Sequence, residues 1–218
     1  PRRSEAAPPP RAPPAAPATV AAAPGSPTTW TFDADAAGAA PAGFRFEQTG
    51  GGPPVHWIVR EESGAPSAAH VLTLTDVDGT NDRFSMAVAD APSLSDLRLS
   101  VKCQPIAGKV DRACGLVFRY RDAANYYVTR ANALEGNVRL YFVKNGRRSQ
   151  IASWSGAVSS NAWHELGIEA RGDRFEIHWD GAKVLEARDR TFSEAGRVGV
   201  WTKADSVTLF DDLGAAPL

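Results

Sequence analysis

The stretch WHELGIEARGDRFEIHWDG, residues 163–181, decides the fold class. In its first half Leu166, Ile168 and Ala170 share one face, and charged side chains occupy the other. The second half alternates in the same way after the turn RGDR, where Gly172 supplies a positive φ. A period of two, interrupted by a tight turn, predicts an antiparallel β-hairpin with one buried face.

The same texture extends along the chain from Trp30 onwards. Short runs of β-branched and aromatic residues end at Gly, Asn or Asp, and no stretch keeps a 3.6-residue apolar period. This excludes a parallel sheet with crossover helices and predicts an all-β sandwich or barrel. The predicted strands are 29–33, 43–48, 55–60, 69–75, 83–90, 95–104, 113–121, 125–132, 137–144, 149–154, 162–171, 174–180, 183–187, 196–202 and 206–213.

Residues 1–28 differ from the rest because Pro and Ala dominate them. Such a segment cannot bury enough apolar surface to offset its ordering entropy, so we predict a disordered linker. The folded domain is predicted at residues 29–218. Because the chain begins at Pro1 and carries no signal-peptide pattern, we expect that a signal peptide has been removed.

Overall charge narrows the classes of partner. The 218-residue chain has a net charge of −1, so we expect no general attraction to nucleic acid or to anionic membranes. Its longest apolar runs fall short of the roughly 18 residues that a membrane span needs. We therefore expect no transmembrane segment, and we expect a monomer.

The two cysteines, Cys103 and Cys114, flank the run QPIAGKVDRA, which we interpret as a hairpin centred near Gly108. Symmetric pairing about that centre puts the cysteines opposite each other, within reach of a disulfide. The alternative is two small buried hydrophobic residues. A disulfide would place the chain in an oxidising compartment.

Three stretches together resemble a known family: GLVFRYRDAANYYVTRANALEGNVRLYFVKNG, WHELGIEARGDRFEIHWDG and AGRVGVWTKADSVTLFDDL. They are similar to bacterial secreted domains of the concanavalin A-like lectin/glucanase superfamily. More narrowly, they resemble its laminin-G-like group of 3-keto-disaccharide hydrolase-like domains of unknown function. The resemblance covers residues 29–213. It implies a jelly-roll sandwich of two antiparallel sheets, one concave, with sugars bound on the concave face or its rim.

The resemblance does not extend to catalytic residues. Retaining glycosidases of the superfamily carry an E-x-D-x-x-E or E-x-D-x-E strand, which places two carboxylates about 5 Å apart. Here Glu165 and Glu169 share a face, but Gly167 stands where the middle Asp is needed. We therefore assign no catalytic residue and favour a protein that is not an enzyme.

The middle strands concentrate Arg, Asn and aromatic residues. Pairing about RDAAN sets Arg119 beside Tyr127, and pairing about ALEGN sets Arg130 beside Arg139. Two such arginines line an exposed face or hold a carboxylate, because neither can be buried unpaired. Aromatic faces and planar donors suit a sugar or a uronate. The predicted ligand-binding residues are Arg119, Tyr127, Arg130, Asn132, Arg139, Tyr141, Trp201 and Lys203. The alternative places the aromatic rings in the core.

Arg130 is taken as an exposed member of this site. We expect Arg130→Ala to weaken ligand binding by about 1.5–3 kcal/mol and to change folding by under about 0.5 kcal/mol.

Aspartates in the first and last predicted strands suggest a cation. These strands are commonly neighbours in a jelly roll, so Asp33 would face Asp211 or Asp212. A hard cation with oxygen ligands, such as Ca²⁺, would relieve their repulsion. The alternative is a set of edge-strand charges and turn caps.

The sequence thus predicts an exported carbohydrate-binding or adhesion module that is secreted, periplasmic or attached to the cell surface. Its partner would be a glycan or oligosaccharide bound on the concave sheet. A glycoside-active hydrolase and a structural domain without a small ligand are the alternatives.

Overall fold

The computed structural model describes residues 26–218, and the predicted linker lies almost entirely outside this range. All fifteen predicted strands are present in the predicted order, and β8 and β9 match their predicted bounds. No helix in the described part of the chain is long and apolar enough to cross a membrane. The strands are β1 (Thr28–Trp30), β2 (Phe44–Thr49), β3 (His56–Glu61), β4 (His70–Thr75), β5 (Phe84–Ala89), β6 (Leu97–Ala107), β7 (Ala113–Asp122), β8 (Asn125–Asn132), β9 (Asn137–Lys144), β10 (Arg147–Ser155), β11 (His164–Arg171), β12 (Arg174–Trp179), β13 (Ala182–Arg188), β14 (Arg197–Lys203) and β15 (Val207–Pro217).

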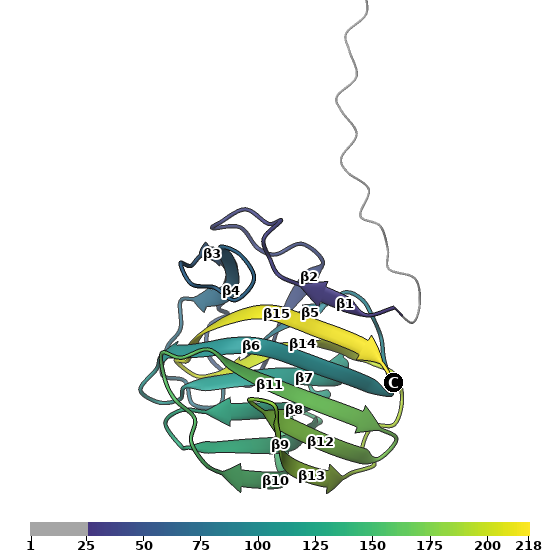
Figure 1. Cartoon of the computed structure of the whole chain (residues 1–218). Coiled ribbons are helices and arrows are strands. Elements are labelled where there is room, and N and C mark those ends of the chain that lie inside the picture. The colour runs from purple at the N-terminus through teal and green to yellow at the C-terminus, as the bar shows by residue number, and fades with distance from the viewer. Residues whose placement is uncertain (1–25) are drawn as a thin grey trace, which may run out of the picture.

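The strands form two antiparallel sheets that pack face to face (Figure 1). The first sheet has the order β13-β12-β11-β6-β15-β4-β3, with β1 paired to β15. The second sheet has the order β10-β9-β8-β7-β14-β5-β2. The first and last strands are neighbours, as predicted, with Trp30 opposite Leu213. The all-β, two-sheet sandwich is therefore confirmed.

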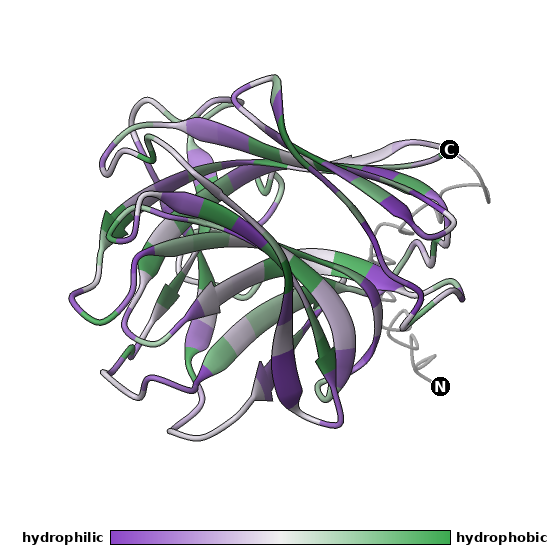
Figure 2. Cartoon of the chain, turned by 90° about the horizontal axis from the view of Figure 1, so that it is seen from below, coloured by the Kyte–Doolittle hydropathy of each residue, from purple (hydrophilic) through white to green (hydrophobic). Residues whose placement is uncertain are grey.

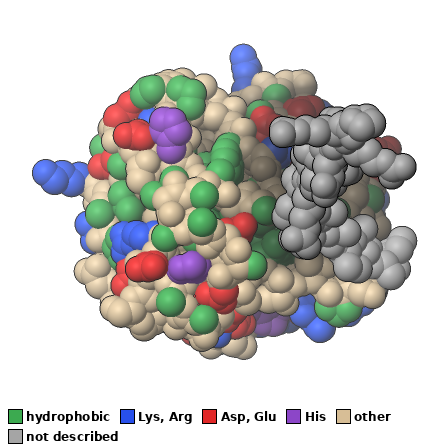
Figure 3. Space-filling model, turned by 90° about the horizontal axis from the view of Figure 1, so that it is seen from above, with side chains coloured by type: hydrophobic (Ala, Val, Ile, Leu, Met, Phe, Trp, Pro, Cys, Tyr) green, Lys and Arg blue, Asp and Glu red, His purple; other side chains and the backbone are tan. Residues whose placement is uncertain are grey.

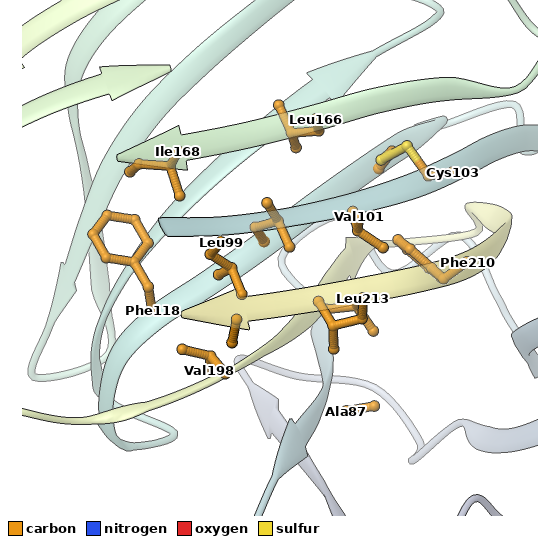
Figure 4. Close-up of a cluster of buried hydrophobic side chains, with 14 of the residues drawn as sticks. Ala87, Leu99, Val101, Cys103, Phe118, Leu166, Ile168, Val198, Phe210 and Leu213 are labelled. Carbon is orange, nitrogen blue, oxygen red and sulfur yellow. A yellow bond between two sulfur atoms is a disulfide. The ribbon is translucent and has the colours of Figure 1, made fainter. Parts of the chain in front are cut away.

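The main core lies between the sheets and follows from the alternation of the strands, which Figure 2 shows as changing hydropathy along each ribbon. Leu166 and Ile168 of β11 point inward beside Leu99 of β6, and Phe118 meets them from the second sheet (Figure 4). These side chains are at most 1 % exposed. Each buried side chain of this size stabilises the fold by about 1.5–3 kcal/mol.

Cys103 and Cys114 form a disulfide, with their Cα atoms 6.2 Å apart (Figure 4). The pairing was predicted, but the hairpin interpretation was wrong. Cys103 lies on β6 in the first sheet and Cys114 on β7 in the second, so residues 108–112 cross between sheets instead of turning within one. The disulfide therefore ties the two layers together in the middle of the core.

We expect the double variant Cys103→Ala/Cys114→Ala to lower the free energy of unfolding by about 2–3 kcal/mol, because a short closed loop restricts the unfolded chain only modestly. Urea denaturation of the variant, beside wild-type protein with and without reductant, measures this loss. A variant as stable as the oxidised protein would contradict the expectation.

Candidate functional site

The second sheet is curled so strongly that side chains of distant strands meet over its outer face. The Oγ1 atom of Thr49 on β2 lies 2.8 Å from the hydroxyl of Tyr126 on β8. In a flat sheet, the four strand spacings between β2 and β8 would alone separate them by roughly 19 Å. Arg148 of β10 likewise lies 4.5 Å from the ring centroid of Phe84 on β5, five strands away. The outer face is therefore concave, as the resemblance implies.

This concave face holds a second hydrophobic cluster, whose members are at most 8 % exposed although they point away from the other sheet. Trp201 packs on Gly115, its partner across the β7–β14 pair. A Cβ atom at position 115 would lie 2.8 Å from Cε3 of Trp201, so the indole needs glycine there. The concave-face cluster comprises Phe84, Met86, Val88, Ala113, Val117, Tyr120, Tyr126, Val128, Tyr141, Val143 and Trp201.

Arg130 and Arg139 are directly opposite each other on β8 and β9, as predicted. Both hold the same carboxylate oxygen, Oε2 of Glu135, at 3.0 and 3.1 Å. Both also donate to the hydroxyl of Tyr141, at 3.2 and 3.4 Å. Burial disfavours the charge on Glu135, but the hydrogen bond from Asn137 and the two guanidinium groups outweigh it and lower its pKa. Glu135 therefore stays ionised between two cations.

A second polar network lies at the same end of the concave face. The buried carboxylate of Asp111 accepts hydrogen bonds from Asn132 Nδ2 at 2.7 Å and from Lys203 Nζ at 2.9 Å. Lys203 also reaches Oδ1 of Asn81 at 2.7 Å. We call the combined set the polar end of the concave face. It comprises Arg130, Arg139, Asn132, Asn137, Glu135, Asp111 and Lys203.

Six of the predicted ligand-binding residues therefore share the concave face, and two do not. Arg119 and Tyr127 point to the other side of the second sheet and are at most 1 % exposed. A register shift after Phe118 means that Tyr127 faces Phe118 and not Arg119. The six that the structure groups are Arg130, Asn132, Arg139, Tyr141, Trp201 and Lys203.

Arg119 binds backbone instead of facing solvent. Its guanidinium donates to the carbonyl oxygens of Ser95, Phe192 and Gly172, each at 2.8 Å. Tyr127 accepts a hydrogen bond from the backbone N–H of Phe192 at 3.1 Å. These two side chains thus fasten the loops at the edge of the sandwich.

The structure also changes the expectation for Arg130. Its side chain is only 3 % exposed and is bonded to Glu135, Asn137 and Tyr141. Removing such a side chain leaves buried acceptors without donors. The interpretation of Arg130 as an exposed residue was therefore wrong, and we now expect Arg130→Ala to destabilise the fold.

Four polar residues of the concave face were missed from sequence: Glu135, Asn137, Asp111 and Arg148. Glu135 lies in the turn between Arg130 and Arg139, and that position was a usable signal. Asp111 lies in the segment misinterpreted as a hairpin. Arg148 lies one residue before the predicted strand 149–154, so its alternation with Gln150 was not considered.

Of the predicted metal ligands, Asp211 and Asp212 lie on β15 of the first sheet and Asp33 lies in the turn after β1, and all three already have polar partners. Asp211 accepts from Ser67 N–H at 3.0 Å and from Ser67 Oγ at 2.9 Å, while the same hydroxyl lies 3.2 Å from Asp33. Asp212 pairs with Lys102 at 2.9 Å. Burial raises the pKa of Asp211. The described residues contain no group of three or more His, Cys, Asp or Glu side chains arranged to hold a metal ion.

The outer face of the first sheet carries two cavities. One, of about 370 Å³, lies between Trp163, His164 and Lys102. The other, of about 260 Å³, opens beside it over Gly167 and His178. Because of these two cavities, the first sheet is a second place where a ligand would fit.

Acidic and basic side chains are interspersed on the end of the molecule that Figure 3 shows, without a patch of one sign.

Comparisons with known proteins agree with this architecture. The carbohydrate-binding module CBM66 from Bacillus subtilis superposes with a TM-score of 0.59 and 26 % sequence identity, over 73 % of this chain and 94 % of that module. The VIP36 exoplasmic/lumenal domain, in its Ca²⁺/Man-bound form, superposes with a TM-score of 0.58 and 10 % identity, over 88 % and 89 % of the two chains. The chain has a concanavalin A-like fold.

One curated sequence adds to this concanavalin A-like assignment. Levanase from Bacillus subtilis strain 168 is 32 % identical over 144 residues, which are 65 % of this chain. The match spans only 20 % of levanase, so this chain corresponds to about a fifth of that protein. No family model matches the chain.

We expect Arg119→Met to lower the free energy of unfolding by about 3–5 kcal/mol, because three carbonyl groups, one of them buried, lose the buried charged donor that they share. The matched control is Arg121→Met, since Arg121 is 38 % exposed and pairs with exposed Glu194. That control should cost under about 1 kcal/mol. Urea denaturation compares the two, and an Arg119→Met protein of wild-type stability would contradict the structural role.

Proposed function

We propose that the chain is a non-catalytic carbohydrate-binding module that recognises a glycan at the polar end of its concave face. The match to CBM66 carries the proposal, because it extends over nearly all of a module described as carbohydrate-binding. Levanase, by its name an enzyme acting on levan, contains a region of similar sequence. A fructan such as levan is therefore one of the first glycans to test.

The chemistry of the concave face supports the proposal. Arg139 is 32 % exposed and Glu135 is 40 % exposed, so both a donor and an acceptor are open to a ligand. Sugar hydroxyl groups both donate and accept, and charge-assisted hydrogen bonds are about twice as strong as neutral ones. Tyr141 and Trp201 are at most 5 % exposed. These two rings pack beneath the arginine side chains, and they are too buried to stack on a sugar ring.

The hydrolase alternative has less support. A general acid needs a carboxyl group with a raised pKa. Glu135 instead has a lowered pKa, and the carboxyl group of Asp111 is bonded to Asn132 and Lys203. The outward-facing Glu165 and Glu169 flank Gly167 in the place of an Asp, as the sequence indicated.

Export and a monomeric state complete the proposal. A disulfide in the core fits an oxidising compartment, because reduced compartments keep such thiols unpaired. We infer that the domain is secreted, periplasmic or attached to the cell surface, and that it acts as a monomer. Size-exclusion chromatography with light scattering tests the monomer.

Affinity electrophoresis of the full chain in gels containing levan, β-glucan, xylan or pectin tests the proposed function. We expect at least one polysaccharide to retard the protein. We expect Arg139→Ala to weaken that binding at least about tenfold, which corresponds to about 1.4 kcal/mol. The matched control is Arg98→Ala, an exposed arginine paired with Glu169 on the first sheet.

Two results would contradict the assigned location or function. If Arg98→Ala or His164→Ala abolishes binding while Arg139→Ala does not, the ligand binds in the cavities of the first sheet. If no polysaccharide retards the protein, the structural-domain alternative gains support.

Calcium is a separate question within this proposal. Ser67 and Lys102 already bond the carboxylates of Asp211 and Asp212. We therefore expect EDTA to leave both the melting temperature and glycan binding unchanged. A melting temperature that falls in EDTA and recovers with Ca²⁺ would instead support a cation between Asp33 and Asp211, because metal bound only to the native state stabilises it.

A further inference from the structure

Among the residues that the structure describes, Arg148 has no charge partner, and its guanidinium lies over the rings of the concave-face cluster. Its guanidinium carbon lies 4.5 Å from the ring centroid of Phe84, 4.6 Å from that of Tyr141 and 5.9 Å from that of Trp201. Its Nη1 atom is buried and has no hydrogen-bond partner. Within residues 26–218 it forms no salt bridge, whereas Arg130 and Arg139 share Glu135.

The surroundings of Arg148 make this unpaired charge costly. Burial lowers the pKa of its guanidinium, and the charge of Arg130 acts in the same direction. Both guanidinium groups contact the Tyr141 ring, with the Arg130 carbon 5.8 Å from its centroid. Aromatic faces attract a cation but do not accept its N–H hydrogen bonds in the way that a carboxylate does.

Positive charge is therefore in excess on this part of the concave face. Glu135 serves both Arg130 and Arg139, and Asp111 is taken by Lys203. Neither of these two carboxylates pairs with Arg148. Its side chain is partly exposed, and its Nη1 atom is fully buried. A ligand that brings its own anion would complete the balance of charge, which a neutral sugar cannot do.

We propose that the glycan recognised on the concave face carries a carboxylate, as a uronic acid does, and that Arg148 is the charge partner of this carboxylate. The proposal rests on the function proposed above and narrows its ligand class. The guanidinium is a planar fork that matches both carboxylate oxygens. Phe84, Tyr141 and Trp201 hold the fork in place, so little side-chain entropy is lost on binding.

The test compares charged and neutral forms of the same sugars by isothermal titration calorimetry on the full chain. The probes are short oligomers of galacturonate, glucuronate and mannuronate, each beside its fully methyl-esterified form. The ester keeps the hydroxyl groups and removes the charge. We expect at least one acid to bind ten times more tightly than its ester, and we expect added salt to weaken only the acid.

Variants of two neighbouring arginines test whether Arg148 is the residue that makes the acid bind more tightly than its ester. Arg148→Met keeps a long apolar side chain over the three rings and should lower affinity for the acid about tenfold without changing affinity for the ester. Arg148→Lys keeps the charge, loses the fork and should fall in between. Arg147→Met is the matched control, because Arg147 is exposed on the other side of β10, and it should bind both forms as wild type does.

The outcomes separate this inference from the proposed function. If glycans bind but no acid binds better than its ester, or if Arg148→Met weakens acid and ester equally, the carboxylate assignment is wrong and the binding function stands. If no glycan of either form binds, the proposed function fails. Thermal melts of each variant identify unfolding, and Arg148→Lys then provides the comparison if Arg148→Met does not fold.

Discussion

The curl of the second sheet is the constraint on which the rest of the structure depends. A sheet in a sandwich normally has one dry face and one wet face. Here Thr49 contacts Tyr126 although their strands are four positions apart, which shows that the second sheet curves strongly around its outer face. Its centre became a second core, and Met86 and Val128 are as buried there as residues between the sheets. The hydrogen-bonded polar network consequently lies at one end of the concave face, and Arg148 lies over the rings of the second core.

A strand buried on both faces also limits what its sequence reveals. The strands were predictable throughout and so were turns such as the one at Gly172, because turn residues and β-branched runs are local signals. The opposition of Arg130 and Arg139 was predictable as well, since the short ALEGN turn fixes their register. In β7 and β8, however, apolar residues occupy both faces, so alternation does not distinguish the inward Tyr127 from the concave-face Tyr126. The assignment of Arg119 to the site failed for this reason and because its strand shifts register after Phe118.

The cysteines illustrate a different limit. A segment that turns back within a sheet and one that crosses to the opposite sheet both need Gly and polar residues, as in the run from Gly108 to Arg112. Sequence alone therefore supports the pairing of Cys103 with Cys114 without distinguishing the two paths. The choice depends on which strands neighbour β6, and these are β11 and β15, far along the chain. The crossing also carries Asp111 to the concave face, where it anchors Asn132 and Lys203.

The distribution of charge on the concave face connects this architecture to function. Covering the aromatic rings with Arg148 removes the stacking surface that the sequence suggested and leaves guanidinium groups as the accessible chemistry. Two arginines hold Glu135 ionised and its pKa is lowered, so this carboxylate is a poor proton donor and a weak base. The accessible guanidinium groups are hydrogen-bond donors, and this suits a ligand that accepts hydrogen bonds. Arginines of three neighbouring strands, β8, β9 and β10, contact Tyr141 through its ring or its hydroxyl, and the curl places Phe84 of β5 against Arg148 of the same group.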